Sequence, residues 1–220
     1  MILVPREKIA AYTAQGWWGA TTLWQLFAHH RRERPGAEAV ADAPNRAEFA
    51  HGAPQRLAWA QLGEAVDRFA LALLDGGVRR DEVLVVQLPN TVEQFIVYLA
   101  CARLGIVATP VPVQYREHEL AHVVATTQAA GAVTFARIGR PEGGHAAAAM
   151  YRGLQAQHPS LRQVFAWGDA VPAGALDLGA ATAQPPDAQA LARLAQAERD
   201  AAVDANDVFT ICWTSGTEAT

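Results

Sequence analysis

The sequence predicts an α/β domain in which helices flank a largely parallel sheet. Two observations lead to this prediction. From Leu62 onward, segments with helical apolar spacing alternate with short β-branched runs, a pattern typical of strand–helix–strand units. The run 82–88 consists mainly of Val and Leu, as expected for a strand that is buried on both faces of a parallel sheet. Crossovers between such strands are expected to be right-handed.

The N-terminal third predicts a helix, a hairpin and a second helix. Thr21 or Thr22 can cap a first helix that continues to about Arg34 and ends at Pro35-Gly36. Its expected buried face comprises Leu23, Leu26, Phe27 and His30. Two short strands at 38–42 and 56–59 are joined by a polar loop, and an amphipathic helix at 61–75 ends at Gly76-Gly77.

The remainder alternates between helices and strands. Expected helices lie at 91–104, 116–128, 146–157 and 187–199. Expected strands lie at 82–88, 106–109, 132–136, 163–167 and 208–213. Residues 168–206 are rich in Ala, Pro, Gln and Asp and lack strand character, so we expect a surface excursion within the domain. Residues 1–20 are expected to form an N-terminal arm.

Composition and charge exclude several classes of function. The net charge of −4 and the lack of a basic cluster argue against a nucleic-acid partner. No apolar run reaches the roughly 18 residues that a transmembrane helix needs. The N-terminus carries charges where a signal peptide would be apolar. Cys101 and Cys212 are isolated, which predicts two buried free thiols and a cytoplasmic protein.

The last residues of the sequence suggest a phosphate-binding loop. An apolar, β-branched run at 208–213 reads as a buried strand, and it leads directly into Thr214-Ser215-Gly216-Thr217. A glycine lets the backbone approach a ligand closely, while hydroxyl groups and successive amide N–H groups can bind anionic oxygens. An ordinary Ser/Thr/Gly turn has the same local composition, so the rest of the chain has to decide between the two.

The loop resembles the nucleotide-binding signature of the acyl-adenylate-forming superfamily, the AMP-dependent synthetases and ligases. Glu218-Ala219 matches one form of that signature. Five further segments resemble the family's landmarks in the correct order, and they cover nearly the whole chain: 22–23, 59–62, 81–90, 99–107 and 115–120. The third of these ends in the family's Leu-Pro-Asn turn. Gly16-Trp17-Trp18 resembles the subgroup that activates aryl or medium-chain acids, although an aromatic anchor for the N-terminal arm is the simpler interpretation.

This resemblance implies that residues 1–220 are the N-terminal portion of the large domain of an ATP-dependent, AMP-forming carboxylate ligase. Such an enzyme uses Mg²⁺ and ATP to convert a carboxylic acid into an acyl-adenylate and passes the acyl group to a thiol, here expected to be coenzyme A. The residues implied to hold the ATP phosphates are Thr214, Ser215, Gly216, Thr217 and Glu218. The family's loop lysine and its later catalytic residues do not occur before Thr220, so we expect an incomplete sheet and an inactive fragment.

Two alternatives remain open. Residues 118–122 read His-Glu-Leu-Ala-His, the spacing with which His118 and His122 could bind zinc, and Glu142 follows 20 residues later as a possible third ligand. Against a zinc hydrolase, Glu142 lies in a loop by composition, and the α/β pattern already accounts for the helix. The second alternative is a truncated nucleotide-binding or interaction module without catalysis.

Overall fold

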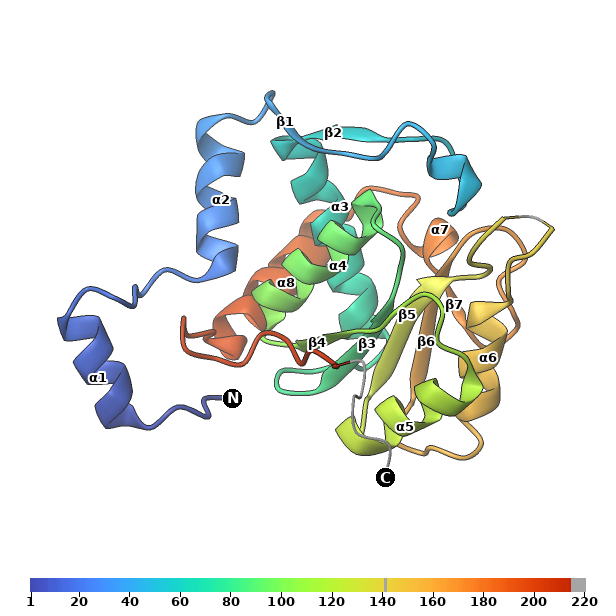
Figure 1. The fold of residues 1–220 in the computed structure, drawn as a ribbon. Coiled ribbons are helices and arrows are strands. Elements are labelled where there is room, and N and C mark those ends of the chain that lie inside the picture. Colours follow the sequence, from blue (N-terminus) through green and yellow to red (C-terminus); the bar gives the residue numbers. More distant parts are fainter. Residues whose placement is uncertain (141, 215–220) are drawn as a thin grey trace.

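The computed structural model describes residues 1–140 and 142–214. The helices are α1 (Arg6–Ala14), α2 (Leu23–Glu33), the short 3-10 helix η1 (Arg46–Glu48), α3 (Trp59–Asp75), α4 (Val92–Leu104), α5 (Glu117–Thr127), α6 (Ala147–Leu154), α7 (Leu178–Ala181) and α8 (Ala188–Ala201). The strands are β1 (Glu38–Ala41), β2 (Arg56–Ala58), β3 (Val83–Gln87), β4 (Val107–Pro110), β5 (Gly131–Phe135), β6 (Gln163–Trp167) and β7 (Leu176–Asp177). Figure 1 shows their arrangement.

A five-stranded parallel sheet lies at the centre of the molecule, in the order β4-β3-β5-β6-β7. In β3, Leu84 and Val86 join the core cluster shared with α3, α4 and α8, whereas Val85 joins the cluster shared with α5 and α6. Successive side chains of a strand point to opposite faces, so the helices form one layer on each side of the sheet (Figure 1). The predicted α/β class with a parallel sheet is confirmed.

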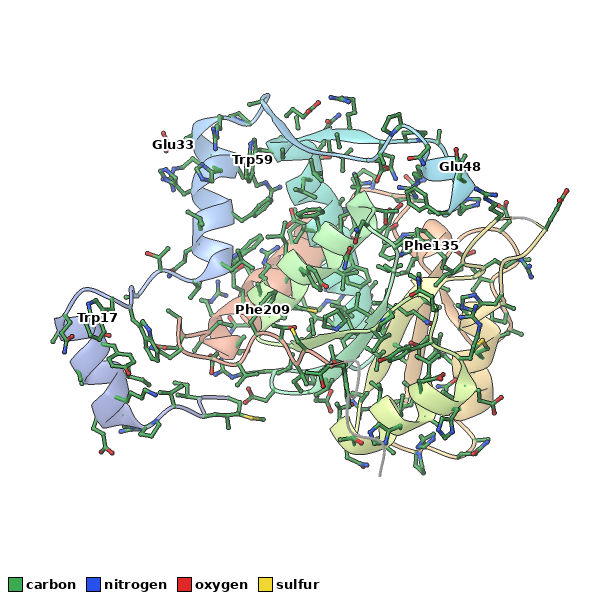
Figure 2. All side chains as sticks on the ribbon, viewed as in Figure 1. Trp17, Glu33, Glu48, Trp59, Phe135 and Phe209 are labelled. Carbon is green, nitrogen blue, oxygen red and sulfur yellow. The ribbon has the colours of Figure 1, made fainter. Side chains whose placement is uncertain are left out.

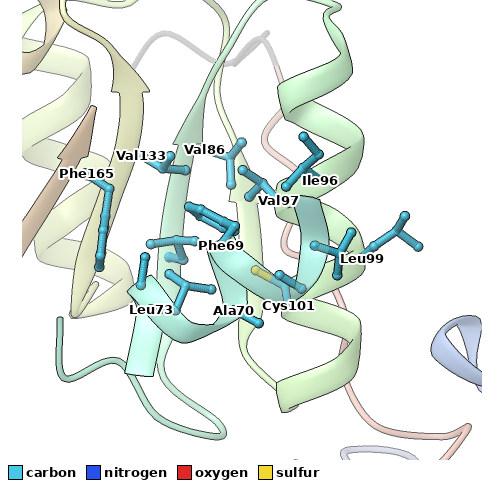
Figure 3. Packing of buried hydrophobic residues seen from close by; sticks show 14 of the residues in the cluster. Phe69, Ala70, Leu73, Val86, Ile96, Val97, Leu99, Cys101, Val133 and Phe165 are labelled. Carbon is cyan, nitrogen blue, oxygen red and sulfur yellow. The ribbon is translucent and has the colours of Figure 1, made fainter. Parts of the chain in front are cut away.

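The larger core cluster centres on Phe69 of α3, which is fully buried. Its ring stacks on Trp167 at 5.4 Å and meets the edge of Phe165 at 6.3 Å (Figure 3). Gly76, expected only as the end of the helix, also packs here, because a Cβ atom at this position would lie 2.4 Å from the Phe165 ring. The end of α3 therefore needs a glycine for packing as well as for termination.

Helix α2 begins where predicted, but it buries a different face. Thr22 caps it through a reciprocal pair of hydrogen bonds with Gln25. Leu23 and Leu26 were expected to be buried, yet they are 44% and 49% exposed. Trp24 takes their place: its ring stacks on Phe27 at 5.3 Å, and its indole N–H donates to Glu198 at 2.7 Å. Burying a large aromatic ring that also gains a hydrogen bond to Glu198 stabilises this orientation of the helix more than burying two leucines would.

Two regions contain elements that the sequence did not predict. Residues 6–14 form α1, which buries none of its residues, so no apolar stripe marked it as a helix. Beside it, Trp17 is 67% exposed and lies at the outer end of the N-terminal region (Figure 2). Within 168–206, the unpredicted β7 pairs with β6, whereas the helix expected at 187–199 is present as α8 and buries Leu194 in the main core cluster. The short β7 had no β-branched signal.

A buried ion cluster joins the β1–β2 connection to α4. The Arg46 side chain is 2% exposed, and its guanidinium donates to Asp42 and to Glu93, each at 2.7 Å. The same guanidinium donates to the carbonyl oxygen of His51. Asp42 also accepts from the backbone N–H of Val92 at 2.8 Å, which satisfies a free donor at the start of α4. Every charge in this cluster therefore has a partner.

Replacing Glu93 with Ala should lower the free energy of unfolding by about 3–5 kcal/mol, because it breaks a buried ion pair and removes the carboxylate that accepts two hydrogen bonds from Arg46. The matched control is Glu38→Ala, which removes the exposed pair with Arg56 at 2.8 Å and should cost less than about 1 kcal/mol. Urea denaturation of both variants measures the difference. Equal losses in the two variants would show that the buried cluster is not a structural constraint.

Candidate functional site

The topology of the sheet directs attention to the carboxyl ends of β3 and β5. The chain passes from β3 to β4 on one side of β3, and then crosses to β5 on the other side. In open parallel sheets the strand order reverses at such a point, and ligands bind in the crevice outside the carboxyl ends of the strands. The structure therefore places a candidate ligand site at this edge.

Gln87, the last residue of β3, lies at this edge and is fully buried. Its side-chain amide donates to the carbonyl oxygens of Pro112 and Tyr115 at 3.2 and 3.1 Å. Its side-chain oxygen has no hydrogen-bond partner among the described residues. A buried acceptor without a partner is costly and uncommon, so it marks a place where a further donor belongs.

The terminal segment, residues 208–214, runs parallel to β4 along its free edge. Thr210 bridges Ala108, whose N–H donates to Phe209 and whose carbonyl accepts from Ile211, both at 3.0 Å. Thr109 is fully buried in β4. Its hydroxyl donates to the carbonyl oxygen of Ile211 at 2.9 Å and accepts from the Trp213 indole at 2.7 Å. One threonine thus fixes both the backbone and the last aromatic residue of the segment.

The prediction of a buried strand at 208–213 is wrong in two respects. The segment forms a single bridge and not a regular strand, and Cys212, expected to be a buried thiol, is exposed. Exposure alternates along the segment: Thr210, Cys212 and Thr214 are exposed, whereas Phe209, Ile211 and Trp213 are partly buried, so one face of the segment points away from the protein. Cys101, by contrast, is fully buried, and burial raises the pKa of its thiol well above the usual range.

The residues predicted to bind phosphate follow this segment. Thr214 is exposed and comes directly after Trp213, whose ring meets the edge of His122 at 5.8 Å. Ser215, Gly216, Thr217 and Glu218 lie outside the described residues. Their assignment as phosphate ligands therefore stays a prediction. The structure describes the segment that leads to them: its chain direction takes it toward the carboxyl edge of the sheet.

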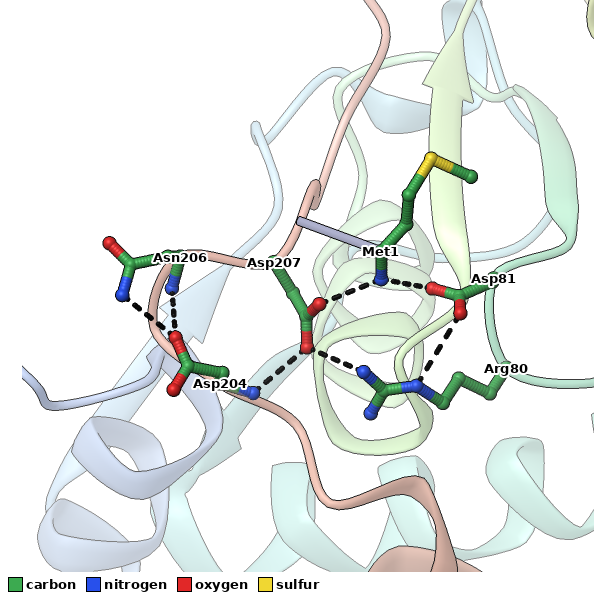
Figure 4. A network of polar contacts seen from close by, with 6 residues as sticks. All are labelled: Met1, Arg80, Asp81, Asp204, Asn206 and Asp207. Atoms are coloured by element: carbon green, nitrogen blue, oxygen red, sulfur yellow. Dashed lines mark hydrogen bonds and ion pairs between the residues drawn. The ribbon is translucent and has the colours of Figure 1, made fainter. Parts of the chain in front are cut away.

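Ion pairs and hydrogen bonds hold Asp207, the residue that directly precedes the terminal segment (Figure 4). The Asp207 side chain, 6% exposed, accepts from Arg80 at 2.9 Å and from the Met1 amino group at 2.7 Å. It also accepts from the N–H of Asp204 at 2.9 Å. Burial opposes the charged form of Asp207, but the hydrogen bonds from Met1 and Asp204 and the charge of Arg80 outweigh it, so the pKa is lowered.

The structure does not bring the possible zinc ligands together. His118 and His122 are exposed on α5, and Glu142 is exposed in a loop. Glu119 accepts from the N–H of Arg116 at 2.9 Å and so caps the helix, a hydrogen bond that lowers the pKa of its carboxyl group. Across residues 1–140 and 142–214, no three His, Cys, Asp or Glu side chains are grouped so that they could hold a metal ion.

Sequence reasoning missed Gln87 and Thr109 as parts of this edge. A signal existed for both: each is a polar residue inside an apolar strand run, where an unexplained polar side chain indicates a specific partner. The partners themselves, at 112–115 and 211–213, could not be inferred, because they depend on which strands are neighbours.

Comparison with known proteins identifies the family. A model of the family described as AMP-binding enzyme matches residues 27–220. The chain belongs to this family. The resemblance to the adenylate-forming superfamily is thereby confirmed, and the fold and the parallel sheet agree with it.

Several relatives of this AMP-binding chain are ligases. It is 33% identical over 168 residues to the salicyl-AMP ligase / salicyl-S-ArCP synthetase of Mycobacterium tuberculosis, covering 76% of this chain and 28% of that protein. It is 34% identical over 191 residues to the 2-hydroxy-7-methoxy-5-methyl-1-naphthoate–CoA ligase of Streptomyces carzinostaticus, covering 87% and 32%. The chain therefore spans about a third of the length of these relatives.

A solved structure also matches. The apo structure of MbtA from Mycobacterium smegmatis superposes with a TM-score of 0.66 at 27% identity, covering 83% of this chain and 31% of that one.

As for membranes, none of the helices in the described ranges is both long and apolar enough to span a bilayer.

Replacing Thr109 with Val should release the terminal segment, because the Trp213 indole N–H and the Ile211 carbonyl both lose their partner. We expect a loss of about 1–3 kcal/mol in stability and faster amide exchange at 208–214, measured by hydrogen–deuterium exchange. Thr109→Ser keeps the hydroxyl and should behave almost like the parent protein. If amide exchange at 208–214 were equally slow in the Val and Ser variants, the Thr109 hydroxyl would not be what fixes the segment.

Asp207 should make stability depend on acid pH. Its folded pKa is lowered from 3.8, so the carboxylate contributes stability that is complete above this value and is lost as the pH falls through the lower folded pKa. Asp207→Asn should therefore cost about 1–3 kcal/mol at pH 7 and progressively less below pH 3.8. Urea denaturation across this range measures it. Asp169→Asn is the control, because the Asp169 side chain is 94% exposed; a pH-independent cost at Asp207 would contradict the assignment.

Proposed function

We propose that this chain is the phosphate-binding part of an ATP-dependent, AMP-forming carboxylate ligase. One observation carries the proposal: the terminal segment runs parallel to β4 and leads Thr214 toward the carboxyl edge of the sheet, where parallel α/β sheets bind ligands. The family assignment and the ligase names of its relatives support it. The loop residues in question are Thr214, Ser215, Gly216, Thr217 and Glu218.

The residues of this edge fit a nucleotide. The loop supplies three hydroxyl groups and a glycine, a set of groups suited to phosphate oxygens. The buried side-chain oxygen of Gln87 has no partner in the part of the chain that the structure describes, and it can accept from an N–H group that approaches this edge. In this proposal the loop offers donors to the phosphate oxygens of a nucleotide, and Gln87 on β3 offers an acceptor to one of its N–H groups.

Bound ATP with Mg²⁺ would supply an electrophilic α-phosphate and a pyrophosphate leaving group. In this proposal the hydroxyls of Thr214, Ser215 and Thr217 and the backbone N–H groups hold the β- and γ-phosphates, while Gly216 allows the backbone to approach them. Phosphoryl chemistry of this kind depends on positioning and on charge stabilisation more than on a protein nucleophile. The Thr109 contacts, which orient the terminal segment, keep the loop in place.

A carboxylic acid is the proposed substrate and a thiol the proposed acceptor. Two of the relatives are named as salicyl-AMP and naphthoate–CoA ligases, so an aryl acid and coenzyme A are the first compounds to test. Because the chain spans about a third of these relatives, we expect residues 1–220 alone to bind nucleotide at most and to form no adenylate.

In the intact protein, Thr217→Ala removes one preorganised donor to a charged group, and Gly216→Val blocks the close approach of the backbone. Each should reduce ATP-dependent pyrophosphate release by about 10²-fold or more. The control is Thr210→Ala on the same segment, since its hydroxyl is exposed and its nearest polar contact is Cys212 at 4.0 Å. Undiminished pyrophosphate release in both loop variants would falsify the assignment. Nucleotide binding without pyrophosphate release in the parent protein would instead indicate a non-catalytic module.

A further inference from the structure

We infer that a second cavity, at the amino-terminal edge of the sheet, binds a small amphipathic anion: an apolar body that carries one carboxylate or sulfonate group. The cavity has a volume of about 410 Å³, within the range typical of small-molecule sites. It lies between the ends of α3, α4 and α8 and the 78–80 turn that precedes β3.

The walls of this cavity are apolar and its rim is cationic. The apolar lining consists of Leu74, Val78, Leu104, Ala197 and Ala201. The charged lining consists of Arg79, Arg80, Arg193 and Asp200. Three guanidinium groups beside an apolar wall favour a ligand with an anionic head and an apolar body.

The arginines differ in how far their charges are already neutralised. Arg193 pairs with Asp75 at 2.5 Å, and Asp200, the single acidic lining residue, accepts a hydrogen bond from Gln196 at 2.7 Å. The Arg79 guanidinium, by contrast, donates to the carbonyl oxygens of Leu74 and Val78 and forms no ion pair with a described carboxylate. The nearby Glu82 carboxylate accepts from the backbone N–H of Arg79 at 2.8 Å.

Arg80 provides a second unmet donor. One of its terminal nitrogens binds Asp207 at 2.9 Å and its Nε lies 3.6 Å from Asp81, but the other terminal nitrogen, Nη1, is buried and has no partner in the described chain (Figure 4). A buried cationic N–H without an acceptor is expensive. Arg80 lines the cavity, so an anion bound there lies beside this cation while the Asp207 contact stays in place.

This cavity is separate from the proposed phosphate site. Val78 and Arg80 precede β3, and Leu104 precedes β4, whereas Thr214 follows a segment that runs parallel to β4. The two sites therefore lie at opposite ends of the strands, on the order of 15 Å apart for strands of this length. Ligands at the two sites should not compete directly.

Isothermal titration calorimetry of the intact protein with octane-1-sulfonate tests the inference. We expect saturable binding with a Kd of roughly tens to hundreds of micromolar, undisturbed by saturating ATP, and no comparable binding of neutral 1-octanol. Arg79→Gln should weaken binding about tenfold, the effect of losing one charge-assisted hydrogen bond. Arg56→Gln, which removes an exposed guanidinium that does not line the cavity, should leave it unchanged.

A second variant, Ala197→Trp, fills the cavity without changing its charge and should abolish binding. Should this variant fail to fold, the Arg79→Gln and Arg56→Gln pair still decides the question. The inference is overturned if no saturable binding occurs up to roughly millimolar concentration. It is equally overturned if ATP displaces the sulfonate, or if both arginine variants behave alike.

Discussion

Parallel pairing of β3 with both of its neighbours is the constraint on which the site depends. Because β4 and β5 run parallel to β3, every strand ends at the same edge of the sheet. The terminal segment adopts the same direction by bridging Ala108 of β4, so it runs toward that edge as well. A segment bonded in the opposite direction would carry the same loop to the amino end of the sheet, where the arginine-lined cavity lies.

Polar groups buried in the apolar framework determine where the connecting segments attach. Thr109 holds the terminal segment, and the Asp42–Arg46–Glu93 cluster holds the β1–β2 connection to the start of α4. Arg80 connects the two proposed sites, since it lines the second cavity and also pairs with Asp207, which directly precedes the terminal segment. These contacts are specific because each buried polar atom would be costly without its partner.

The sequence predicted strands β3 to β6 and the helices that flank them, since periodicity and turn residues are local signals, but it did not predict β7. The sequence predicted less well which side chains are buried, because burial depends on the elements that pack against them. Leu23 and Leu26 have helical spacing, yet Trp24 occupies the core because Glu198 of α8 lies across from it and Phe27 of the same helix stacks on its ring. Cys212 lies in an apolar run, yet it is exposed because its side chain is on the face of the terminal segment that points away from the protein. The phosphate-binding loop is predicted from its residues and its order in the chain, whereas Gln87 and Thr109 became recognisable only when the strand neighbours were known.

Hydrogen–deuterium exchange of the intact protein, with and without a non-hydrolysable α,β-methylene analogue of ATP, tests the central claim most directly. We expect the analogue to slow amide exchange in peptides covering 208–218 and the carboxyl ends of β3 and β5. Exchange at the 78–80 turn should remain unchanged. Protection confined to the 78–80 turn, or the absence of protection at 208–218 with the analogue bound, would contradict the placement of the phosphate site at the carboxyl edge of the sheet.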